Sequence, residues 1–283
     1  MNTESAELLV HNQASHGEGP VWADGVLYWV DLTGCRLHAL RSVDGTVRNF
    51  QFSEPVCAVA PLAEERLLIA FAKRLAYVNL ADLSCEEICQ VEPDLPGNRC
   101  NDGKMDPAGR FWIGTMSNDG SVKEAGALYR LDEGGRLTRV LDQLTIANGM
   151  GWSRDSKTMY FIDSPTREIL AFDFDSSDSS IRNRRTVVSV PDGLGVPDGM
   201  EVGGDDTLWV AHWGPGCVCH WDPETGTLLQ RIDTGCPHTS SCCLSDEGHL
   251  YITTSRLGLD EAALANHPRS GGLFRHNPIK SSK

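Results

Sequence analysis

The sequence predicts an all-β fold, a six-bladed β-propeller, because one pattern recurs six times along its 283 residues. Each copy has a polar loop residue, a short strand, a turn and a second strand rich in aromatic residues. The copies lie about 40 to 50 residues apart, which is the spacing of propeller blades. They start at Gly17, Val56, Asn101, Asn148, Asp198 and Ser240.

The spacing inside the copies supports this repeat. Glu18 and Trp29 are 11 residues apart, and four other copies keep the same separation between the corresponding positions. In the fourth copy, Asn148 and Tyr160 are 12 residues apart. A nearly constant distance from the polar residue to the second strand indicates one structural unit, and we use it to align the blades.

Turn and strand signals agree with two paired strands in each copy. Residues that tolerate left-handed backbone conformations, as tight hairpins require, stand between the strands. They are Asp24-Gly25, Pro107-Ala108-Gly109, Asp205-Asp206 and Asp246-Glu247-Gly248. The second strands read LYWVD, FWIGT, MYFID, LWVAH and LYITT, as expected of strands buried between stacked blades. No segment shows sustained helical periodicity.

Further strands complete the blades, with candidates from Ala127, Ile169 and Cys217. The last copy has room for one more strand, Gly272 to His276, and an open last blade would leave a sheet edge exposed. We therefore expect Glu7 to His11 to supply its outer strand and close the ring. The polar segment from Asp173 to Arg185 reads as a surface loop, and residues 1–283 read as one domain.

Charge and composition restrict the partners. The net charge of −14 and the isoelectric point of about 5.0 disfavour nucleic acid as a partner and are compatible with a bound cation. The N-terminus lacks the features of a signal peptide, and no run of 18 apolar residues predicts a membrane span. The 10 cysteines, which form no C-x-x-C pair, suggest reduced thiols and a cytoplasmic protein.

The repeat also aligns six residues in the loops that lead into the innermost strands, at one mouth of the central channel. They are Glu18, Val56, Asn101, Asn148, Asp198 and Ser240. Carboxylates and carboxamides from four blades would converge there, and such oxygen donors suit a hard divalent cation. Each residue alone is better explained as a turn or cap residue, since Asn-Gly and Asp-Gly are common turn dipeptides. Together in one register they favour a site.

The sequence contains none of the common motifs of other catalytic sites. The sequence has no G-x-S-x-G elbow, no H-E-x-x-H pair and no P-loop. Among nine histidines, only His212 and His238 are expected near strand ends that face the mouth, where either could be an ordinary packing residue.

Several motifs together resemble the gluconolactonase/regucalcin (senescence marker protein) family over nearly the whole chain. They are GEGPVW with Glu18, RCNDGKMDPAGRFWIGTM from Arg99, NGMGWS from Asn148, IRNRR from Ile181, VPDGM with Asp198, TSSCC from Thr239 and GGLF from Gly271. The resemblance implies a six-bladed propeller, one divalent metal ion (Ca²⁺, Mg²⁺, Mn²⁺, Zn²⁺ or Fe²⁺) and hydrolysis of a small-molecule sugar lactone to the sugar acid.

The same resemblance assigns the site residues. It makes Glu18, Asn148 and Asp198 the metal ligands, Asp198 also the candidate general base, and Arg99 and Asn101 the residues that contact the lactone. Metal-bound hydroxide, with Asp198 only as a ligand, is the alternative base, since a carboxylate bound to a cation is a weaker base.

One segment departs from the family. Relatives of regucalcin have glutamates after the G-T-M motif that reach the sugar, whereas Ser117, Asn118 and Asp119 stand here. We expect five- or six-membered lactones of hexoses or pentoses as substrates, with an acidic group tolerated at the far end.

Three other functions remain open at this stage. The first is a non-enzymatic calcium-binding regulator, which would keep the ligands but would not require Arg99 and Asn101. The second is a scaffold for protein interaction, which would present an apolar surface. The third is an esterase that cleaves another ester, such as an organophosphate, at the same metal. Fold alone does not separate these functions.

Overall fold

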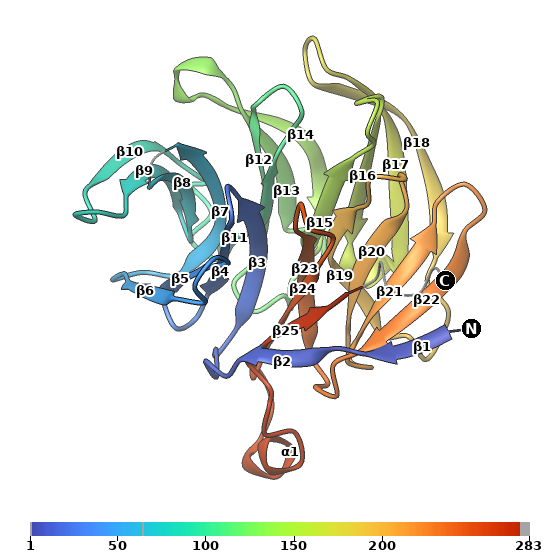
Figure 1. Ribbon diagram of the computed structural model, residues 1–283. Helices are drawn as coiled ribbons and strands as arrows, with labels where there is room; N and C mark the ends of the chain where they lie inside the picture. The colour runs from blue at the N-terminus through green and yellow to red at the C-terminus, as the bar shows by residue number, and fades with distance from the viewer. Residues whose placement is uncertain (1, 64, 278–283) are drawn as a thin grey trace.

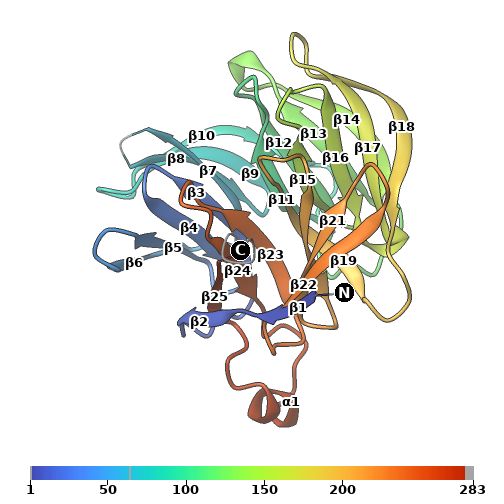
Figure 2. The same ribbon diagram turned by 45° about the vertical axis from the view of Figure 1, so that its right-hand side comes forward.

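A computed structural model describes residues 2–63 and 65–277, and these residues form the six-bladed β-propeller that the sequence predicts (Figures 1 and 2). Six sheets surround a central axis, and consecutive strands pair within each sheet. The first strands of neighbouring blades contact one another around the ring, so they are the innermost strands. The repeat register therefore corresponds to the same position in each blade.

The first three blades each consist of four consecutive antiparallel strands. Blade 1 contains β3 (Gly17–Ala23), β4 (Val26–Asp31), β5 (Arg36–Arg41) and β6 (Val47–Gln51). Blade 2 contains β7 (Val56–Ala63), β8 (Arg66–Phe71), β9 (Arg74–Asn79) and β10 (Cys85–Gln90). Blade 3 contains β11 (Asn98–Met105), β12 (Phe111–Ser117), β13 (Gly126–Leu131) and β14 (Leu137–Leu144).

The last three blades follow the same order, and the N-terminal segment joins two of them. Blade 4 contains β15 (Ala147–Trp152), β16 (Thr158–Asp163), β17 (Glu168–Asp175) and β18 (Ser180–Ser189). Blade 5 contains β19 (Val196–Val202), β20 (Leu208–Trp213), β21 (Cys217–Asp222) and β22 (Thr227–Asp233). Blade 6 contains β23 (Thr239–Leu244), β24 (Leu250–Thr254) and β25 (Leu273–His276).

The N-terminus closes the ring as expected. Strand β2 (Glu7–Val10) pairs antiparallel with β25, with Leu8 opposite Phe274, and it is the outer strand of blade 6. The chain before it forms an additional strand that the sequence did not indicate. This strand, β1 (Asn2–Ser5), pairs parallel with β22 and gives blade 5 a fifth strand. The N-terminal segment thus connects the last two blades, as Figure 1 shows along the lower edge of the ring.

One expectation is wrong, and one further element was not indicated by the sequence. The segment from Asp173 to Arg185 is not a loop, because it contains the end of β17 and the start of β18 and turns only in between. The chain between β24 and β25 contains a short helix, α1 (Glu261–Asn266), although helical periodicity is absent. The Asp260 side chain caps it by accepting a hydrogen bond from the Ala263 amide at 2.8 Å. Six residues are too few to show periodicity.

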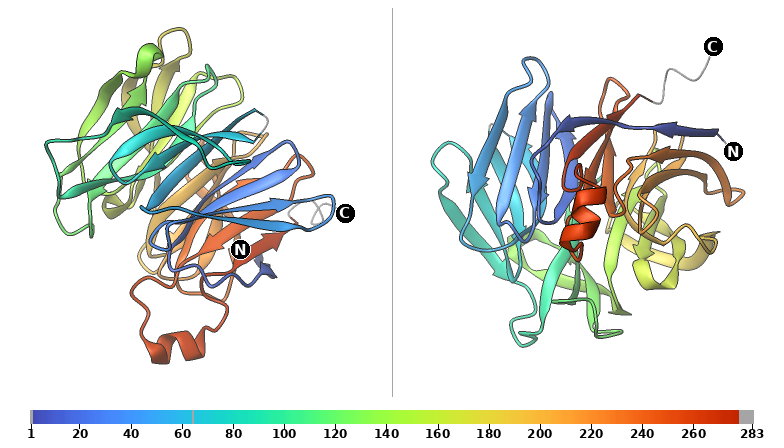
Figure 3. Two further views of the ribbon diagram at one scale, coloured as in Figure 1. Left: turned by 90° about the vertical axis from the view of Figure 1, so that its left-hand side faces the viewer. Right: turned by 90° about the horizontal axis from the view of Figure 1, so that it is seen from below.

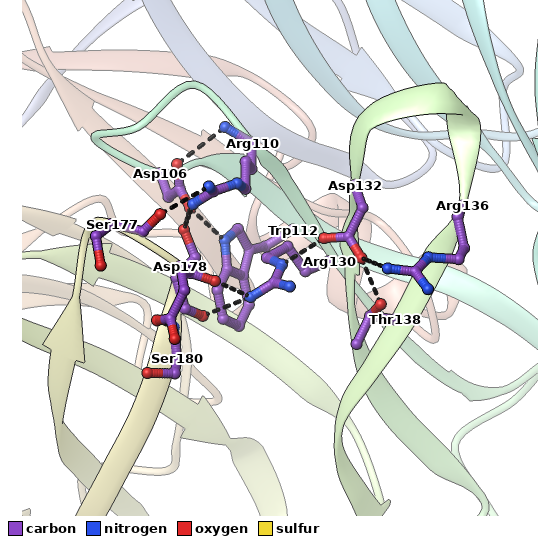
Figure 4. A network of polar contacts seen from close by, with 11 residues as sticks. Asp106, Arg110, Trp112, Arg130, Asp132, Arg136, Thr138, Ser177, Asp178 and Ser180 are labelled. Atoms are coloured by element: carbon purple, nitrogen blue, oxygen red, sulfur yellow. Dashed lines mark hydrogen bonds and ion pairs between the residues drawn. The ribbon is translucent and has the colours of Figure 1, made fainter.

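The β17–β18 hairpin is anchored to blade 3 by a polar network (Figure 4). The Arg130 guanidinium donates to the carbonyl oxygens of Asp178 and Ser179 at 2.6 and 2.8 Å. Asp106 accepts from the Ser179 hydroxyl at 2.6 Å and from the Trp112 indole at 2.9 Å. These contacts keep a strongly polar segment ordered as strands.

The predicted tight turns are present. Asp24 and Gly25 both have positive φ, at 48° and 77°, which is the pairing of a type I′ hairpin. Asp206 and Gly248 also have positive φ, at 63° and 79°. These turns lie at the end of the ring opposite the starts of the inner strands, so they are remote from the predicted mouth.

The core consists of apolar layers between neighbouring blades. Six buried clusters fill the six gaps between blades, and each draws its residues from the two blades that it joins. Trp29, Trp112 and Trp221 are among the largest fully buried side chains. The aromatic second strands are therefore buried between blades, as predicted. Within the described residues, no helix has the length and apolar character needed to cross a membrane.

Candidate functional site

Every inner strand is irregular at the position that the repeat aligns. The pairing of the first two strands shifts register there in all six blades, for example between Glu18 and Val21, and between Cys100 and Gly103. Bulges end regular pairing and redirect side chains, and they are frequent next to functional sites. The predicted polar residues therefore stand in a ring of bulges at one end of the channel. Figure 3 (right) views the molecule from the end where α1 projects, which is this same end.

The glycines after Asn148 and Asp198 allow close approach of inner strands rather than turns. Gly149 and Gly199 lie inside β15 and β19, and neither has positive φ. A Cβ at Gly149 would lie 2.5 Å from the Asp198 carbonyl oxygen, and one at Gly199 would lie 2.1 Å from Ser241 Oγ. The interpretation of Asn-Gly and Asp-Gly as turn dipeptides is therefore wrong here. The glycines bring the polar side chains of blades 4, 5 and 6 together.

Two carboxylates influence each other, and the positive charge of Arg99 offsets their charge only in part. Burial and the charge of Asp102 raise the pKa of Glu18 to about 8, and the Gly19 amide and Arg99 oppose this only in part. Burial and the charge of Glu18 raise the pKa of Asp198 well above its usual value. Asp198 is 6% exposed, and no described residue donates a hydrogen bond to its buried Oδ1. Buried charges are normally paired or coordinate a metal, so this oxygen fits a cation.

Asn148 completes a set of three oxygen donors. Its Nδ2 donates to Ser164 Oγ at 3.0 Å, and its amide also lies beside the Asp198 carboxylate, whose pKa it lowers. Because the nitrogen is engaged, the carboxamide oxygen is the atom available to a cation. No cluster of three or more His, Cys, Asp or Glu side chains suited to a metal occurs in the described residues. The expected ligand set contains only two such side chains, Glu18 and Asp198, and its third ligand is an asparagine. Two carboxylates and a carboxamide fit one hard divalent cation and leave positions open.

Arg99 and Asn101 are connected to each other. Arg99 Nη1 donates to Asn101 Oδ1 at 2.7 Å and to the Cys100 carbonyl at 2.9 Å. Asn101 Nδ2 donates to the Ala147 carbonyl at 2.9 Å, which ties blade 3 to blade 4. The Arg99 charge lowers the pKa values of both Glu18 and Asp198, so the guanidinium lies close to the carboxylate pair. Asn101 thus holds Arg99 beside the predicted metal ligands.

The loop after the G-T-M motif contributes to the site mainly through its backbone. Asn118 accepts a hydrogen bond from Arg99 Nε with its carbonyl oxygen at 3.3 Å. Asp119 binds the amide and hydroxyl of Ser121 within its own turn, at 3.0 and 2.7 Å. Ser117 is 3% exposed and accepts from the Val122 amide at 3.1 Å. Among these three residues, Asn118 is the one in contact with a predicted site residue.

Sequence reasoning missed charged residues deeper in the channel. Burial raises the pKa of Asp102, whose charge in turn acts on Glu18 and Asp198. Lys104 Nζ donates to Glu201 at 2.7 Å and to the Met200 carbonyl at 3.1 Å. Lys104 and Glu201 line a cavity of about 340 Å³ towards the opposite end of the channel. Asp102 could have been found because it directly follows Asn101, but the alignment of the repeats selected Asn101 alone.

Two histidines and a tryptophan also lie at the mouth. The rings of Trp213 and His238 stack with centroids 4.0 Å apart, and His16 meets Trp213 edge-on at 5.7 Å. The sequence indicated His238 but neither His16 nor Trp213. His212 is a packing residue, since it is fully buried and binds the Leu194 carbonyl at 2.8 Å.

Comparison with known proteins identifies the family of the chain. The family model described as "SMP-30/Gluconolactonase/LRE-like region" matches residues 16–256. Regucalcin of Danio rerio is 36% identical to the chain, and the match covers 97% of this chain and 95% of that protein.

Two solved structures are also similar. A calcium-binding protein, regucalcin, from Agrobacterium tumefaciens has a TM-score of 0.91 at 26% identity, covering 97% of this chain and 94% of that chain. A gluconolactonase from Xanthomonas campestris has a TM-score of 0.73 at 28% identity, covering 95% and 87%. The match spans all six blades and includes every predicted site residue. The chain belongs to the SMP-30/gluconolactonase/LRE-like family.

Proposed function

We propose that this protein is a metal-dependent hydrolase that opens a sugar lactone to the corresponding sugar acid in the cytoplasm. The observation that carries the proposal is the buried, unpartnered Asp198 Oδ1 beside Glu18 and Asn148, with the Arg99 guanidinium close by. A cation would neutralise the two carboxylates, and the arginine would face the substrate. Membership of a family that includes gluconolactonases supports lactones as the substrate class.

Glu18, Asn148 and Asp198 would hold one divalent metal ion, which when bound supplies Lewis-acid polarisation of the lactone carbonyl. Water adds to the carbonyl carbon, and Asp198 accepts the proton that the water loses. Burial raises the pKa of Asp198 and so favours proton uptake, whereas a bound cation acts in the opposite direction. The bond between the acyl carbon and the ring oxygen then breaks, and the ring oxygen takes up a proton to become a hydroxyl group.

Arg99 stabilises the negative charge that develops on the carbonyl oxygen. Its position is fixed by hydrogen bonds to Asn101, Cys100 and Asn118. Asn101 uses Nδ2 for the Ala147 carbonyl and accepts from Arg99 with Oδ1, so we assign it mainly to orienting the guanidinium. The further expectation that Asn101 also contacts the lactone rests on the second lone pair of Oδ1.

The test is hydrolysis of a panel of aldonolactones and acid-substituted lactones, followed as proton release at neutral pH. The panel includes five- and six-membered lactones of hexoses and pentoses. Activity should disappear with a chelator and return to different degrees with Mn²⁺, Mg²⁺, Ca²⁺, Zn²⁺ or Fe²⁺. Rates equal to the uncatalysed rates for every lactone, with every metal, would overturn the proposal.

A non-enzymatic calcium-binding role is the second candidate, favoured by the similarity to a calcium-binding regucalcin. It needs Glu18, Asn148 and Asp198 but gives no reason for the Arg99–Asn101 pair. Calcium binding by a protein that opens no lactone would favour this role. An organophosphate ester in the same assay tests a third possibility, an esterase that acts on other substrates at the same metal.

A further inference from the structure

A second ring of side chains lies two residues before the first. The residue that precedes each aligned residue by two stands just before it, towards the same end of the channel. In blades 1, 3 and 6 these residues are His16, Arg99 and His238, which precede Glu18, Asn101 and Ser240. In blade 2 the residue is Glu54, which pairs with Arg74 at 2.6 Å, and in blades 4 and 5 the residues are Ile146 and Val196. The two histidines are the members of this ring to which no role has been assigned.

Two members of this ring enclose an aromatic side chain. Trp213 ends β20, and its backbone bridges to His238 just before β23. The two rings lie almost parallel, 4.0 Å apart with an interplanar angle of 11°. His16 meets the tryptophan edge-on at 83° and is held by a 2.9 Å hydrogen bond between its Nδ1 and Ser255 Oγ. His16 is 7% exposed, whereas Trp213 and His238 are only partly buried. His16 is therefore the buried support of a pair of rings that is itself partly exposed.

The pair is continuous with the proposed reaction site. His16 stands two residues before Glu18, and Ser240, two residues after His238, donates to the Gly17 carbonyl at 2.6 Å. The two histidines are therefore held beside the start of the strand that carries Glu18. A ligand with its carbonyl at the carboxylate pair would thus extend past His16 towards these rings.

The chemistry of the pair suits the ring of a sugar. Aromatic faces carry partial negative charge and attract the positively polarised C–H groups of a flat, saturated ring. Small-molecule sites combine such faces with a few polar groups that fix orientation. The imidazole of His238 carries ring nitrogens that donate or accept a hydrogen bond, and a substrate hydroxyl group is a partner of the right kind.

We propose that Trp213 and His238 form the platform that recognises the hydroxylated ring of the lactone and selects sugar lactones over unsubstituted ones. The ring carbons rest against the stacked side chains, and a hydroxyl group of the sugar bonds to His238. This inference rests on the proposed lactonase function. It adds specificity-determining residues from blades 5 and 6 to a site assigned so far to blades 1, 3, 4 and 5.

The experiment compares two six-membered lactones that differ only in hydroxylation, an aldono-δ-lactone and δ-valerolactone. The kcat/KM values are measured for the parent, Trp213→Ala, Trp213→Phe and His238→Ala. We expect Trp213→Ala and His238→Ala to lose about tenfold for the sugar lactone, mainly through KM, and to change little for δ-valerolactone. Trp213→Phe keeps an aromatic face and should retain most of the selectivity.

The control is Trp22→Ala. Trp22 stacks on Tyr251 at 5.6 Å and bonds to Asp246, at the hairpin end of the ring and away from the mouth. The Trp22→Ala variant should leave the ratio of the two kcat/KM values unchanged. Equal losses on both lactones in the Trp213 and His238 variants, or no loss on either, would overturn the platform. A parent that opens neither lactone would instead overturn the proposed function.

A direct binding measurement covers the case in which Trp213→Ala does not fold. The probe is the sugar acid product, titrated into the metal-loaded parent and into Trp213→Phe and His238→Ala by calorimetry. Weaker binding to His238→Ala than to the parent is expected, by about tenfold. Equal affinity for these two proteins would contradict the proposed hydrogen bond from the sugar.

Discussion

Asp198 combines deep burial with an oxygen that no described residue neutralises. If the missing partner is a cation, replacing Glu18, Asn148 or Asp198 by Ala should abolish metal retention and leave the fold intact, because these residues add little to the apolar core. Asp119→Ala is the control, since this exposed acid binds within its own turn. Metal content of the purified variants and their melting curves provide the test. Full metal occupancy and activity in Asp198→Ala would show that the site is elsewhere.

Arg99 and Asn101 should behave as one unit. Arg99→Ala removes the positive charge beside the carboxylates, and Asn101→Ala removes the acceptor that holds it. Each should lower kcat/KM roughly tenfold or more, or on the order of 1 to 3 kcal/mol for a lost polar or charged contact.

The double variant should cost less than the sum of the two single variants, because both changes break the same interaction. Steady-state kinetics on an aldonolactone measures this. If both single variants match the parent, the lactonase function fails and the calcium-binding role becomes the better explanation.

His212 is predicted to make folding sensitive to acid. Its Nδ1–H donates to the Leu194 carbonyl, and its Nε2 accepts from the Trp221 indole at 3.4 Å, so only the neutral ring fits. Burial lowers its pKa to about 4 from 6.5, with smaller contributions from Arg231 and Arg167. Below pH 6.5 the unfolded chain binds a proton that the folded chain does not, so stability should fall towards pH 4. The loss is about 3 kcal/mol at pH 4.

Denaturant unfolding between pH 4 and 7 measures this loss. His212→Gln, which can replace both hydrogen bonds, should have a shallower dependence of stability on pH than the parent. The matched His267→Gln variant changes a more exposed histidine and should keep the parental slope. An identical slope in His212→Gln would contradict the assignment.

At the residue level, the repeat explains which residues the sequence could place at the mouth. A constant register aligns positions that are far apart in sequence, so Glu18, Asn148 and Asp198 could be assigned to one ring from the sequence alone. Trp213 could not, because it ends the second strand of its blade, outside the aligned position. Asp102 was missed because its position beside the Glu18–Asp198 pair depends on the bulge in β11, which residue type does not reveal.

At the level of elements, ring closure depends on two N-terminal strands with different roles. Strand β2 covers the edge of β25, whereas β1 lies along β22 and adds polar contacts around Glu4. Glu4 accepts from Gln230 at 2.9 Å and approaches His276 at 3.4 Å. The two strands therefore differ in what their loss would expose.

Removing residues 2–5 should lower the melting temperature slightly and leave the protein monodisperse, since β22 gains only an exposed polar edge. Removing residues 1–12 uncovers β25 and should cause aggregation. Light scattering and thermal melting of the two truncated proteins distinguish these outcomes. A soluble and fully active protein without residues 1–12 would show that closure does not depend on β2.

Elements with a strong repeat were predictable, and those without one were not. Strands such as β4, β12 and β16 show the apolar and aromatic residues that burial between blades requires. Strand β1, with sequence NTES, has no apolar pattern because backbone pairing to β22 alone defines it. Helix α1 also leaves no signal in the sequence, since its six residues are too few to form a periodic apolar face.

For the whole molecule, the residues that hold the ring together are separate from those of the proposed site. The six apolar clusters between blades hold the ring together and lie outside the polar mouth. The ten cysteines are free thiols, so disulfides contribute nothing to this stability. The charges of Glu18, Asp102 and Asp198 repel one another, and a bound cation would relieve this repulsion.

This separation predicts the effect of a chelator on the intact protein. A ligand present at 100 times its Kd stabilises the folded state by about 2.7 kcal/mol, so removing the metal costs an amount of that order. For a chain of this size such a loss lowers the melting temperature by several degrees and leaves the propeller folded, because no apolar cluster depends on the metal. The circular dichroism spectrum should therefore change little and the melting temperature should fall by only several degrees under conditions in which lactone hydrolysis is lost completely, and both should recover on addition of metal. Unfolding of the blades on chelation would instead indicate a structural ion. In that case the cation would be required to hold the inner strands together against the repulsion of Glu18, Asp102 and Asp198.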